Sequence, residues 1–404
     1  MSLLLALLLC VPADTLTVDD DGLHADFPSL VAAVAAASAG DILQVEAGNY
    51  DPFILTKNIM ILGPADGPRP KVQGRSVISG VTGAMIGGLD FGSFAADSVP
   101  GSLLLDDCTF GVGGLPSVAS STLDLVSCDA VEVQRCTVHG LDDSAGTGLR
   151  ATDSRVSVVA SQIVGGTGLP AAVLGCVGNG GKGGPGIRAT NAKLSVTNCI
   201  VRGGQGGASC GLPALDGAAG DGLVAGDSQT LVRGAPTDSV SAGPFDPATS
   251  SPGHDIVLSG GKLVISGVSY NPADVEVVGG GIFADPGHAE PWLTLNDAVG
   301  EGDVLELSLE GPPATPALLF CALLTDQFPL GKLELPLWLA ADHSLFILTL
   351  VTQGAGAPVV LPFTLPAGLD GLDVHLQAVF GTEPSVLVPG KVVVTNPVSP
   401  LIRF

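Results

Sequence analysis

The segment GLRATDSRVSVVASQIVGG, at Gly148–Gly166, is followed by a close copy, GIRATNAKLSVTNCIVRGG, at Gly186–Gly204. Eight of the nineteen aligned positions are identical, and several others exchange similar residues. Each copy alternates apolar and polar residues over short runs and ends in paired glycines. Such a unit can bury its apolar face only by stacking on neighbouring copies. The repeat therefore predicts an elongated β-solenoid.

Short strands of period 2 recur on both sides of this repeat. Leu123–Val126 and Leu263–Ile265 are two of them, and turns rich in Gly, Asp and Ser separate them. Strands of this length build coils of a few tens of residues. Parallel strands in stacked coils satisfy each other's backbone groups, so only the two ends of the stack expose strand edges.

The segment after residue 13 predicts a helix that covers the N-terminal end of the solenoid. Thr15–Val18 is expected to be a strand, and an Ala-rich helix is expected from Phe27, with Pro28 in its first turn and Gly40 at its end. One face of this helix would be apolar and cap the solenoid. We expect that face to consist of Phe27, Leu30, Val31 and Val34.

After the helix, Gly40–Val45 leads into a strand, and a Gly48-Asn49-Tyr50 turn precedes the first coils, which reach Gly63. This order resembles the opening of the pectate-lyase-like right-handed parallel β-helix families. The resemblance implies an all-β fold, a right-handed parallel β-helix with an N-terminal cap helix. Its motifs are specific to the fold and not to a reaction.

Composition divides the chain into three parts. Residues 1–13 contain the apolar run Leu3–Val11 and the small-residue site Val11-Pro12-Ala13, which predict a secretory signal peptide and export. Residues 14–284 are expected to form the β-helix. Residues 285–404 carry about seven Pro- and Gly-broken strands of antiparallel type, which predict a smaller C-terminal β-sandwich.

Two glycine-rich loops interrupt the coils, at residues 165–186 and 203–222. Both follow the repeated strand unit, so we expect them to leave the same corner of successive coils and lie side by side. Each loop contains one cysteine, and we expect Cys176 and Cys210 to form a disulfide. Long loops in a compact fold are usually functional or disordered, and this bond would limit the disorder.

Three other cysteines, Cys108, Cys136 and Cys199, occupy similar points of three strand units. Their equivalent positions predict a stack of thiols that point into the core. The chain has no Cys-x-x-Cys pair, so a zinc site is not expected.

The charge of the chain limits its partners. Forty acidic residues against 16 basic ones give a net charge of -24, which would repel nucleic acid and anionic lipid. No segment is long and apolar enough to span a bilayer. Acidic polysaccharides would be repelled as well unless calcium bridged the two, and the scarcity of Trp and Tyr argues against a dedicated sugar-stacking platform. We expect a monomer.

The repeat places cations at equivalent positions. Arg150 matches Arg188, and Arg155 matches Lys193, so stacking would form rungs of positive charge on one face. The β-helix polysaccharide lyases that the fold resembles use an Arg or Lys base together with calcium or another cation. The catalytic candidates are Arg150, Arg188, Asp142, Asp143 and Asp153, and the calcium candidates are Asp106, Asp107 and Asp129. Ordinary outward side chains paired with neighbours explain the same pattern.

The β-helix glycoside hydrolases, which the architecture also resembles, use clustered aspartates with a His. Asp142 and Asp143 follow His139 by three and four residues, but the further motifs of those enzymes are missing. Adjacent residues of a strand also point to opposite faces. Two functions therefore stay open. The first is an exported, non-catalytic β-helix protein for adhesion, surface coating or weak polysaccharide binding. The alternative is a polysaccharide-cleaving lyase or hydrolase. We favour the non-catalytic function.

Overall fold

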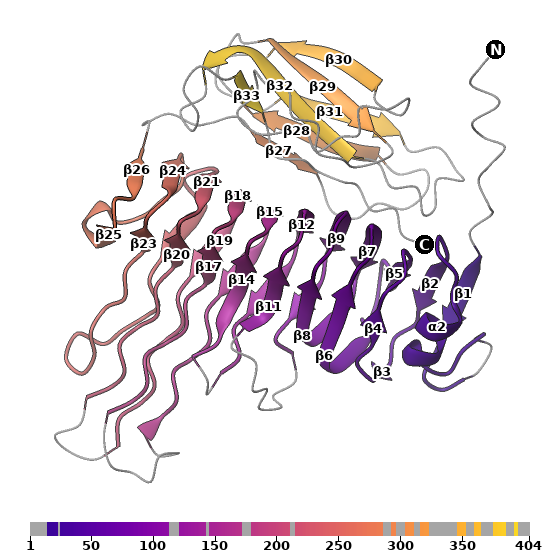
Figure 1. Cartoon of the computed structure of the whole chain (residues 1–404), viewed down its shortest axis with the longest axis horizontal. Helices are drawn as coiled ribbons and strands as arrows, with labels where there is room; N and C mark the ends of the chain where they lie inside the picture. Colours follow the sequence, from indigo (N-terminus) through magenta and orange to yellow (C-terminus); the bar gives the residue numbers. More distant parts are fainter. Residues whose placement is uncertain are drawn as a thin grey trace.

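The structure, a computed structural model, confirms the predicted right-handed parallel β-helix. It describes residues 14–22, 25–112, 121–142, 145–171, 179–210, 215–285, 292–295, 304–310, 316–322, 346–352, 359–364, 375–384 and 392–394. The coils stack side by side along the longest axis of the molecule (Figure 1). Each complete coil contributes three short strands, and two tight corners and one longer loop connect them.

One side of the solenoid is an 11-stranded parallel sheet. It consists, in order, of β1 (Thr15–Val18), β2 (Ile42–Val45), β5 (Met60–Leu62), β7 (Gly83–Gly87), β9 (Ser102–Asp106), β12 (Ala130–Gln134), β15 (Arg155–Val159), β18 (Lys193–Thr197), β21 (Gln229–Arg233), β24 (Lys262–Ser266) and β26 (Ile282–Ala284). We call it the eleven-stranded sheet.

The other two sides belong to a 15-stranded sheet, which divides into two arms at the long strand β8 (Asp90–Asp97). The first arm consists of β11 (Ser121–Val126), β14 (Thr147–Thr152), β17 (Ile187–Thr190), β20 (Leu223–Gly226), β23 (Ile256–Ser259) and β25 (Val275–Val278). The second arm consists of β10 (Thr109–Phe110), β13 (Thr137–His139), β16 (Gln162–Val164), β19 (Ile200–Arg202) and β22 (Ser239–Ser241). Near the N-terminus, β3 (Asn49–Tyr50) and β4 (Ile54–Leu55) pair with β6 (Lys71–Ser79), which pairs with β8.

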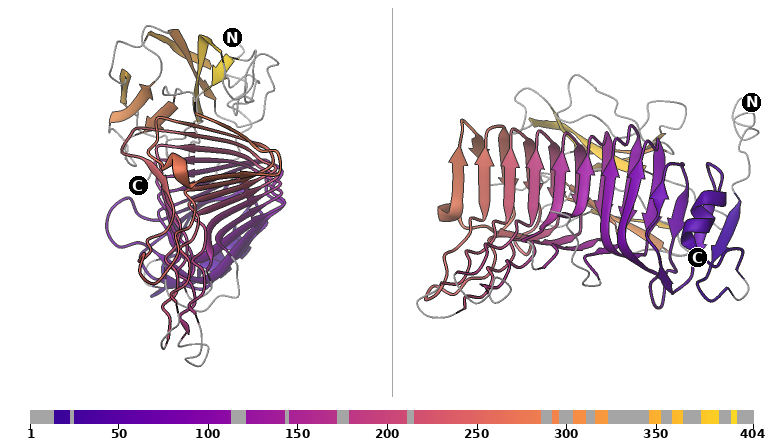
Figure 2. Two further views of the ribbon diagram at one scale, coloured as in Figure 1. Left: turned by 90° about the vertical axis from the view of Figure 1, so that its left-hand side faces the viewer. Right: turned by 60° about the horizontal axis from the view of Figure 1, so that its bottom comes forward.

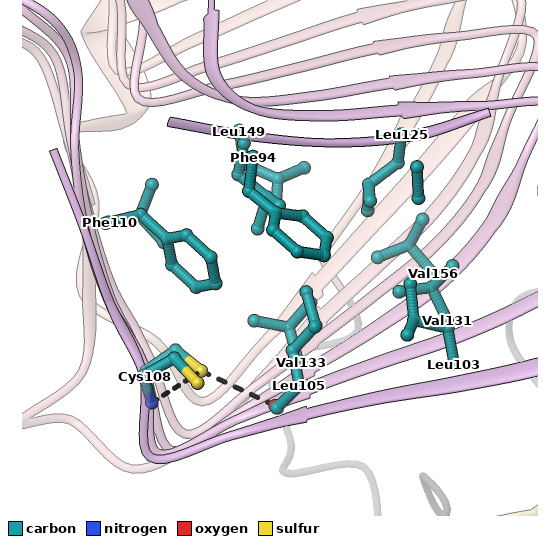
Figure 3. Close-up of a cluster of buried hydrophobic side chains, with 14 of the residues drawn as sticks. Phe94, Leu103, Leu105, Cys108, Phe110, Leu125, Val131, Val133, Leu149 and Val156 are labelled. Carbon is teal, nitrogen blue, oxygen red and sulfur yellow. Dashed lines mark hydrogen bonds between the residues drawn. The ribbon is translucent and has the colours of Figure 1, made fainter. Parts of the chain in front are cut away.

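Inward side chains of all three sides fill one continuous core. Equivalent residues stack in rows because each coil repeats the same register. Phe91 lies against Phe94 and Phe110, with ring centroids 5.2 and 5.4 Å apart. Figure 3 shows apolar side chains such as Phe94, Phe110 and Val133 in this core, with Cys108 at one corner. The alternation in the repeat is therefore explained, since Leu149 and Ala151 lie in the core while Arg150 between them faces outward.

The second corner of each coil confirms that the three predicted thiols point into the core, although a serine interrupts their stack. Cys108, Cys136 and Cys199 are all buried. The backbone N–H of Cys108 donates to Cys136 Sγ at 3.5 Å. Ser161 occupies the place between Cys136 and Cys199, and its hydroxyl accepts the N–H of Cys136 at 3.0 Å. A small polar or thiol side chain therefore links each corner to the next coil.

The helix at the N-terminal end is α2 (Leu30–Ala36), which begins after its N-cap Ser29 and is shorter than the sequence predicts. Leu30, Ala33 and Val34 are its buried residues. The prediction that Val31 lies on the apolar face is wrong, because its side chain is 42% exposed. Ala33 takes its place, since a small residue lets the helix approach the first coil closely.

The two glycine-rich loops do lie side by side, as predicted, and they form a layered structure that we call the glycine slab. It comprises residues 165–171, 179–186, 203–210 and 215–222. Backbone hydrogen bonds between neighbouring segments repeat every third residue. The N–H groups of Gly165 and Gly168, for example, donate to the carbonyl groups of Arg202 and Gln205. This is the three-residue period of a polyproline-II-type helix. Figure 2 shows the loops projecting together from one edge of the solenoid.

Glycine is required within the slab because its segments touch through their backbones. A Cβ atom built on Gly204 would lie 2.0 Å from the carbonyl oxygen of Gly166, and one on Gly183 would lie 2.2 Å from that of Gly204. The Gly-Gly-x triplets of the sequence supply this spacing. Cys176 lies outside the described residues, so the disulfide with Cys210 stays a prediction.

The described strands after Ala284 are antiparallel and form two small sheets. The first consists of β27 (Trp292–Leu295), β28 (Val304–Glu310) and β31 (Val359–Thr364). The second consists of β30 (Phe346–Thr352), β29 (Pro316–Ala322), β32 (His375–Pro384) and β33 (Val392–Val394). They lie over the eleven-stranded sheet (Figure 1). Among the described residues, no helix is long and apolar enough to cross a membrane. The predicted signal peptide lies outside them.

Candidate functional site

The sequence repeat places two arginines in one outward row of the first arm. Arg150 of β14 and Arg188 of β17 are direct register partners, and Asp124 of β11 is the partner of Arg150 on its other side. Strands of a sheet lie about 4.8 Å apart, so a row of this kind brings side chains of successive coils into contact. The rungs of charge that the repeat predicts are therefore present.

Asp124 faces outward in this row and binds two arginines. Both nitrogens of the Arg150 fork bind it, with Nε 2.7 Å from Oδ1 and Nη2 2.5 Å from Oδ2. Arg75 Nη2 lies 3.0 Å from Oδ2 on the opposite side. The two arginines cover the carboxylate, which leaves the residue only 4% exposed. Asp124 is thus a structural counter-ion.

Arg150 is a poor candidate for a catalytic base. Its bidentate hydrogen bond to Asp124 raises the pKa of the guanidinium above its ordinary value, although partial burial opposes this. A base must lose its proton to act, and this environment holds the proton on. Arg150 can therefore attract an anion but not accept a proton.

Arg188 differs from Arg150 in having no acidic register partner. Its next neighbour in the row is Val224, and the residue is exposed. Within the part of the chain that the structure describes, Arg188 makes no ion pair. Its guanidinium is therefore free to bind an anion from solution.

A second cationic row begins just past the first corner. Arg155 of β15 and Lys193 of β18 are register partners on the eleven-stranded sheet. Desolvation, followed by repulsion from Arg155, lowers the pKa of the Lys193 ammonium. Neither residue has an ion-pair partner among the described residues. We call Arg150, Arg188, Arg155 and Lys193 the cationic corner.

Asp153 lies between the two rows, at the corner itself. It adopts a left-handed backbone with φ of 50°, and so does its equivalent Asn191, with φ of 49°. Asn191 Nδ2 donates to Asp153 Oδ1 at 2.6 Å. Asp and Asn tolerate this conformation better than most residues, so their presence here has a structural reason. Across residues 148–155 and 186–193, four cations thus face one carboxylate.

The three calcium candidates do not converge on one point. Asp106 is buried on the eleven-stranded sheet, where its Oδ2 binds Arg135 Nη2 at 2.5 Å. Asp107 turns away at the second corner and binds Arg69 at 2.5 Å. Asp129 is exposed. In the described ranges, no three His, Cys, Asp or Glu side chains gather into a group able to hold a metal ion. Calcium binding stays a prediction.

The remaining catalytic candidates lie away from the cationic corner. Asp142 is in the loop between β13 and β14, where its Oδ1 accepts the backbone N–H of Thr167 at 3.0 Å. It therefore fastens the base of the glycine slab. Asp143 lies outside the described residues.

Sequence reasoning missed Arg75 and Asp124. Neither belongs to the repeated segment, and the contacts of Asp124 with Arg75 and Arg150 require the register of four successive strands, β6, β8, β11 and β14. One signal was available, because Asp124 stands between two core leucines and must face outward.

No protein-family model and no curated protein matches the chain. Among solved structures, pectate lyase Pel9A aligns with a TM-score of 0.37 and 13% identity over 72% of this chain and 80% of its own. The enzymatically active domain of tailspike protein 2 from bacteriophage CBA120 aligns with a TM-score of 0.28 and 12% identity over 93% of this chain and 73% of its own. Scores this low leave the function to be argued from the residues themselves.

Proposed function

We propose that the chain is an exported, non-catalytic β-helix protein that binds an acidic polysaccharide at the cationic corner. The observation that carries this proposal is the set of three exposed or half-buried cations, Arg188, Arg155 and Lys193, without carboxylate partners among the described residues. Cations are scarce in this chain, with 16 Lys and Arg in 404 residues. Their concentration at one corner is therefore a local exception to the net charge of -24.

The shape of the site favours a linear polymer over a compact ligand. The two rows run along the axis of the solenoid for one step each, from Arg150 to Arg188 and from Arg155 to Lys193, before Val224 and Gln229 follow in the next coil. Extended repeat proteins use such continuous surfaces to bind extended partners. A polyanion would meet Arg188 and Lys193 here and carboxylates elsewhere, so binding is expected to be weak and confined to this corner.

The pairing of Arg150 with Asp124 supports a non-catalytic role. The bidentate hydrogen bond to Asp124 raises the pKa of the Arg150 guanidinium, which disfavours Arg150 as the base of an elimination. One observation favours the alternative, a lyase. The pKa of Lys193 is lowered beside Arg155, and a lysine of this kind can take the proton next to a uronate carboxyl that Arg155 neutralises.

A polysaccharide panel tests both functions. The purified chain is incubated with acidic and neutral polymers, with and without calcium, and binding is measured together with the absorbance of unsaturated products. Binding of acidic polymers without product, weakened by Arg188→Ala, supports the proposal. Unsaturated product that Lys193→Ala abolishes would instead establish the lyase. Binding that Arg188→Ala and Lys193→Ala both leave unchanged would contradict both.

A further inference from the structure

The outward face of the eleven-stranded sheet is covered, although outward faces of a solenoid usually meet water. Val159 of β15 belongs to one buried cluster with Leu307, Leu319 and Phe380 of the antiparallel sheets. The antiparallel strands lie over this side of the solenoid (Figure 1). The β-helix alone would leave this face exposed to water, yet some of its residues, such as Val159 and Gln134, are 2% exposed or less.

Polar side chains interrupt this covered face in its middle. Glu132, Ser157 and Ser195 are successive register partners on β12, β15 and β18. Thr197 and Arg233 are register partners one pleat further along, on β18 and β21. All five are buried, and Ser157, Thr197 and Arg233 have no measurable exposure. A carboxylate, a guanidinium and three hydroxyls are thus enclosed together. We call them the covered polar cluster.

The three hydroxyls of this cluster lack hydrogen-bond partners. Ser157 Oγ, Ser195 Oγ and Thr197 Oγ1 are buried atoms with no donor or acceptor in reach among the described residues. Serines at the corners of the same coils behave differently. Ser154 Oγ lies 2.7 Å from the carbonyl oxygen of Thr152, and Ser161 Oγ lies 2.8 Å from that of Val159. Buried polar groups are almost always paired, so three adjacent exceptions indicate a missing partner.

We propose that the covered polar cluster is a binding site for a small sugar acid, held between the eleven-stranded sheet and the antiparallel sheets. Hydroxyl groups donate and accept, so Ser157, Ser195 and Thr197 match the ring hydroxyls of a saccharide. The carboxylate of Glu132 accepts from further hydroxyls, and the guanidinium of Arg233 matches the carboxylate of the sugar acid.

Interfaces between domains are common places for small ligands, and the polar groups there set the specificity. The cluster is closed to solvent, so a ligand enters when the antiparallel sheets move away from the β-helix. This site is separate from the cationic corner. Its residues lie in the middle and at the far end of the strands, whereas Arg155 and Lys193 begin them.

The test measures ligand-induced thermal stabilisation of the full chain, because a ligand that binds only the folded state raises Tm. The probes are glucuronic and galacturonic acid, with glucose and galactose as neutral controls. The variants are Thr197→Val, which keeps the shape and removes the hydroxyl, and Thr190→Val as a matched control on the exposed surface of β17. Ser157→Ala repeats the test with a smaller change.

We expect a sugar acid to raise the Tm of the unaltered chain and of Thr190→Val. Thr197→Val and Ser157→Ala should keep or raise the Tm of the ligand-free chain, because an unpaired buried hydroxyl is removed, and should weaken the ligand about tenfold. Retention of the full shift in both variants would overturn the proposal, as would a shift of equal size with glucose. No shift with any sugar would overturn it too, and would leave water as the partner of the hydroxyls.

An Arg188→Ala/Lys193→Ala variant separates this site from the cationic corner. Its response to the sugar acid should equal that of the unaltered chain. A loss of response in this variant, with none in Thr197→Val, would place the sugar acid at the cationic corner and overturn the assignment to the covered polar cluster.

Discussion

Arg150 and Arg188 lie opposite each other on neighbouring strands, and the carboxylate of Asp124 binds only the first of them. If acidic and basic residues alternated along this row, their charges would cancel. Instead three arginines share one carboxylate: Arg75 and Arg150 both bind Asp124, and Arg188 has no ion-pair partner among the described residues. The cost of two adjacent guanidinium groups falls when an anion binds between them, which is the physical basis of the proposed binding site.

The Asp124 carboxylate should contribute to the stability of the β-helix. We expect Asp124→Ala to lower the free energy of unfolding by about 2 kcal/mol, because Arg75 and Arg150 lose their shared partner while both stay partly solvated. Denaturant titration measures this change. Asp66→Ala, in an exposed loop, is the control and should change stability by less than about 0.5 kcal/mol. Equal effects of the two substitutions would show that Asp124 is not a special counter-ion.

The pKa of Lys193 should depend on Arg155. Arg155→Ala removes a neighbouring positive charge, so the pKa of Lys193 should rise toward its ordinary value. Desolvation is the larger cause of the lowered pKa, so part of the depression should persist. An NMR titration that follows the lysine side chain measures the shift. A pKa that stays where it was would mean that the two side chains do not face each other in solution.

The buried thiols should make the fold sensitive to alkali. Burial raises the pKa of Cys128 to about 11 and that of Cys199 to about 12, against an ordinary value of 9.0. Because the folded pKa exceeds the unfolded one, this stabilisation is complete below pH 9 and is lost as pH rises toward the folded pKa. Each such thiol removes about 1.4 kcal/mol per pH unit in that window.

Cys199→Ala tests this directly. The free energy of unfolding, measured at intervals from pH 8 to pH 11, should fall less steeply in the variant, by the equivalent of one proton. Tyr50, whose pKa burial raises to about 12, is present in both proteins and cancels in the comparison. Parallel pH profiles would contradict a buried Cys199.

The glycine slab should tolerate no side chain in its interior. Gly204→Ala would place a Cβ atom 2.0 Å from the backbone of Gly166, so we expect a loss of about 3 kcal/mol or more. Gly83→Ala is the control, because the nearest atom to its Cβ is Ser102 Oγ at 3.9 Å. Thermal unfolding distinguishes the two. A Gly204→Ala variant as stable as Gly83→Ala would rule out the close backbone packing of the slab.

The β-helix was predictable from the sequence in the region of the repeated segment. Aligning the two copies of the repeat matches Leu149 with Ile187 and Arg150 with Arg188. Equivalent residues of a solenoid stack directly, so this alignment predicts the register in which β14 and β17 pair. The triplet spacing of Gly165 and Gly168 was also visible, but it was interpreted only as a loop. Its three-residue period is the signal that predicts a packed backbone layer.

Other parts of the site could not be predicted in this way. Ser157 and Ser195 follow the outward alternation of an exposed strand, yet both are buried, on the face where Val159 packs against the antiparallel sheets. Asp124 likewise gains its role from Arg75 and Arg150 on other coils. Burial and pairing of this kind depend on tertiary contacts, which a local pattern of residues does not contain.

The most direct test of the proposed function is the affinity for one acidic polysaccharide, measured by titration calorimetry over a range of salt concentrations. The unaltered chain should bind, and its affinity should fall as salt rises, because the cationic corner acts through charge. Arg188→Ala/Lys193→Ala should bind more weakly and lose much of that salt dependence, while Lys71→Ala, which removes an exposed cation from another part of the β-helix, should not. Equal affinity and equal salt dependence in all three proteins would contradict binding at the cationic corner.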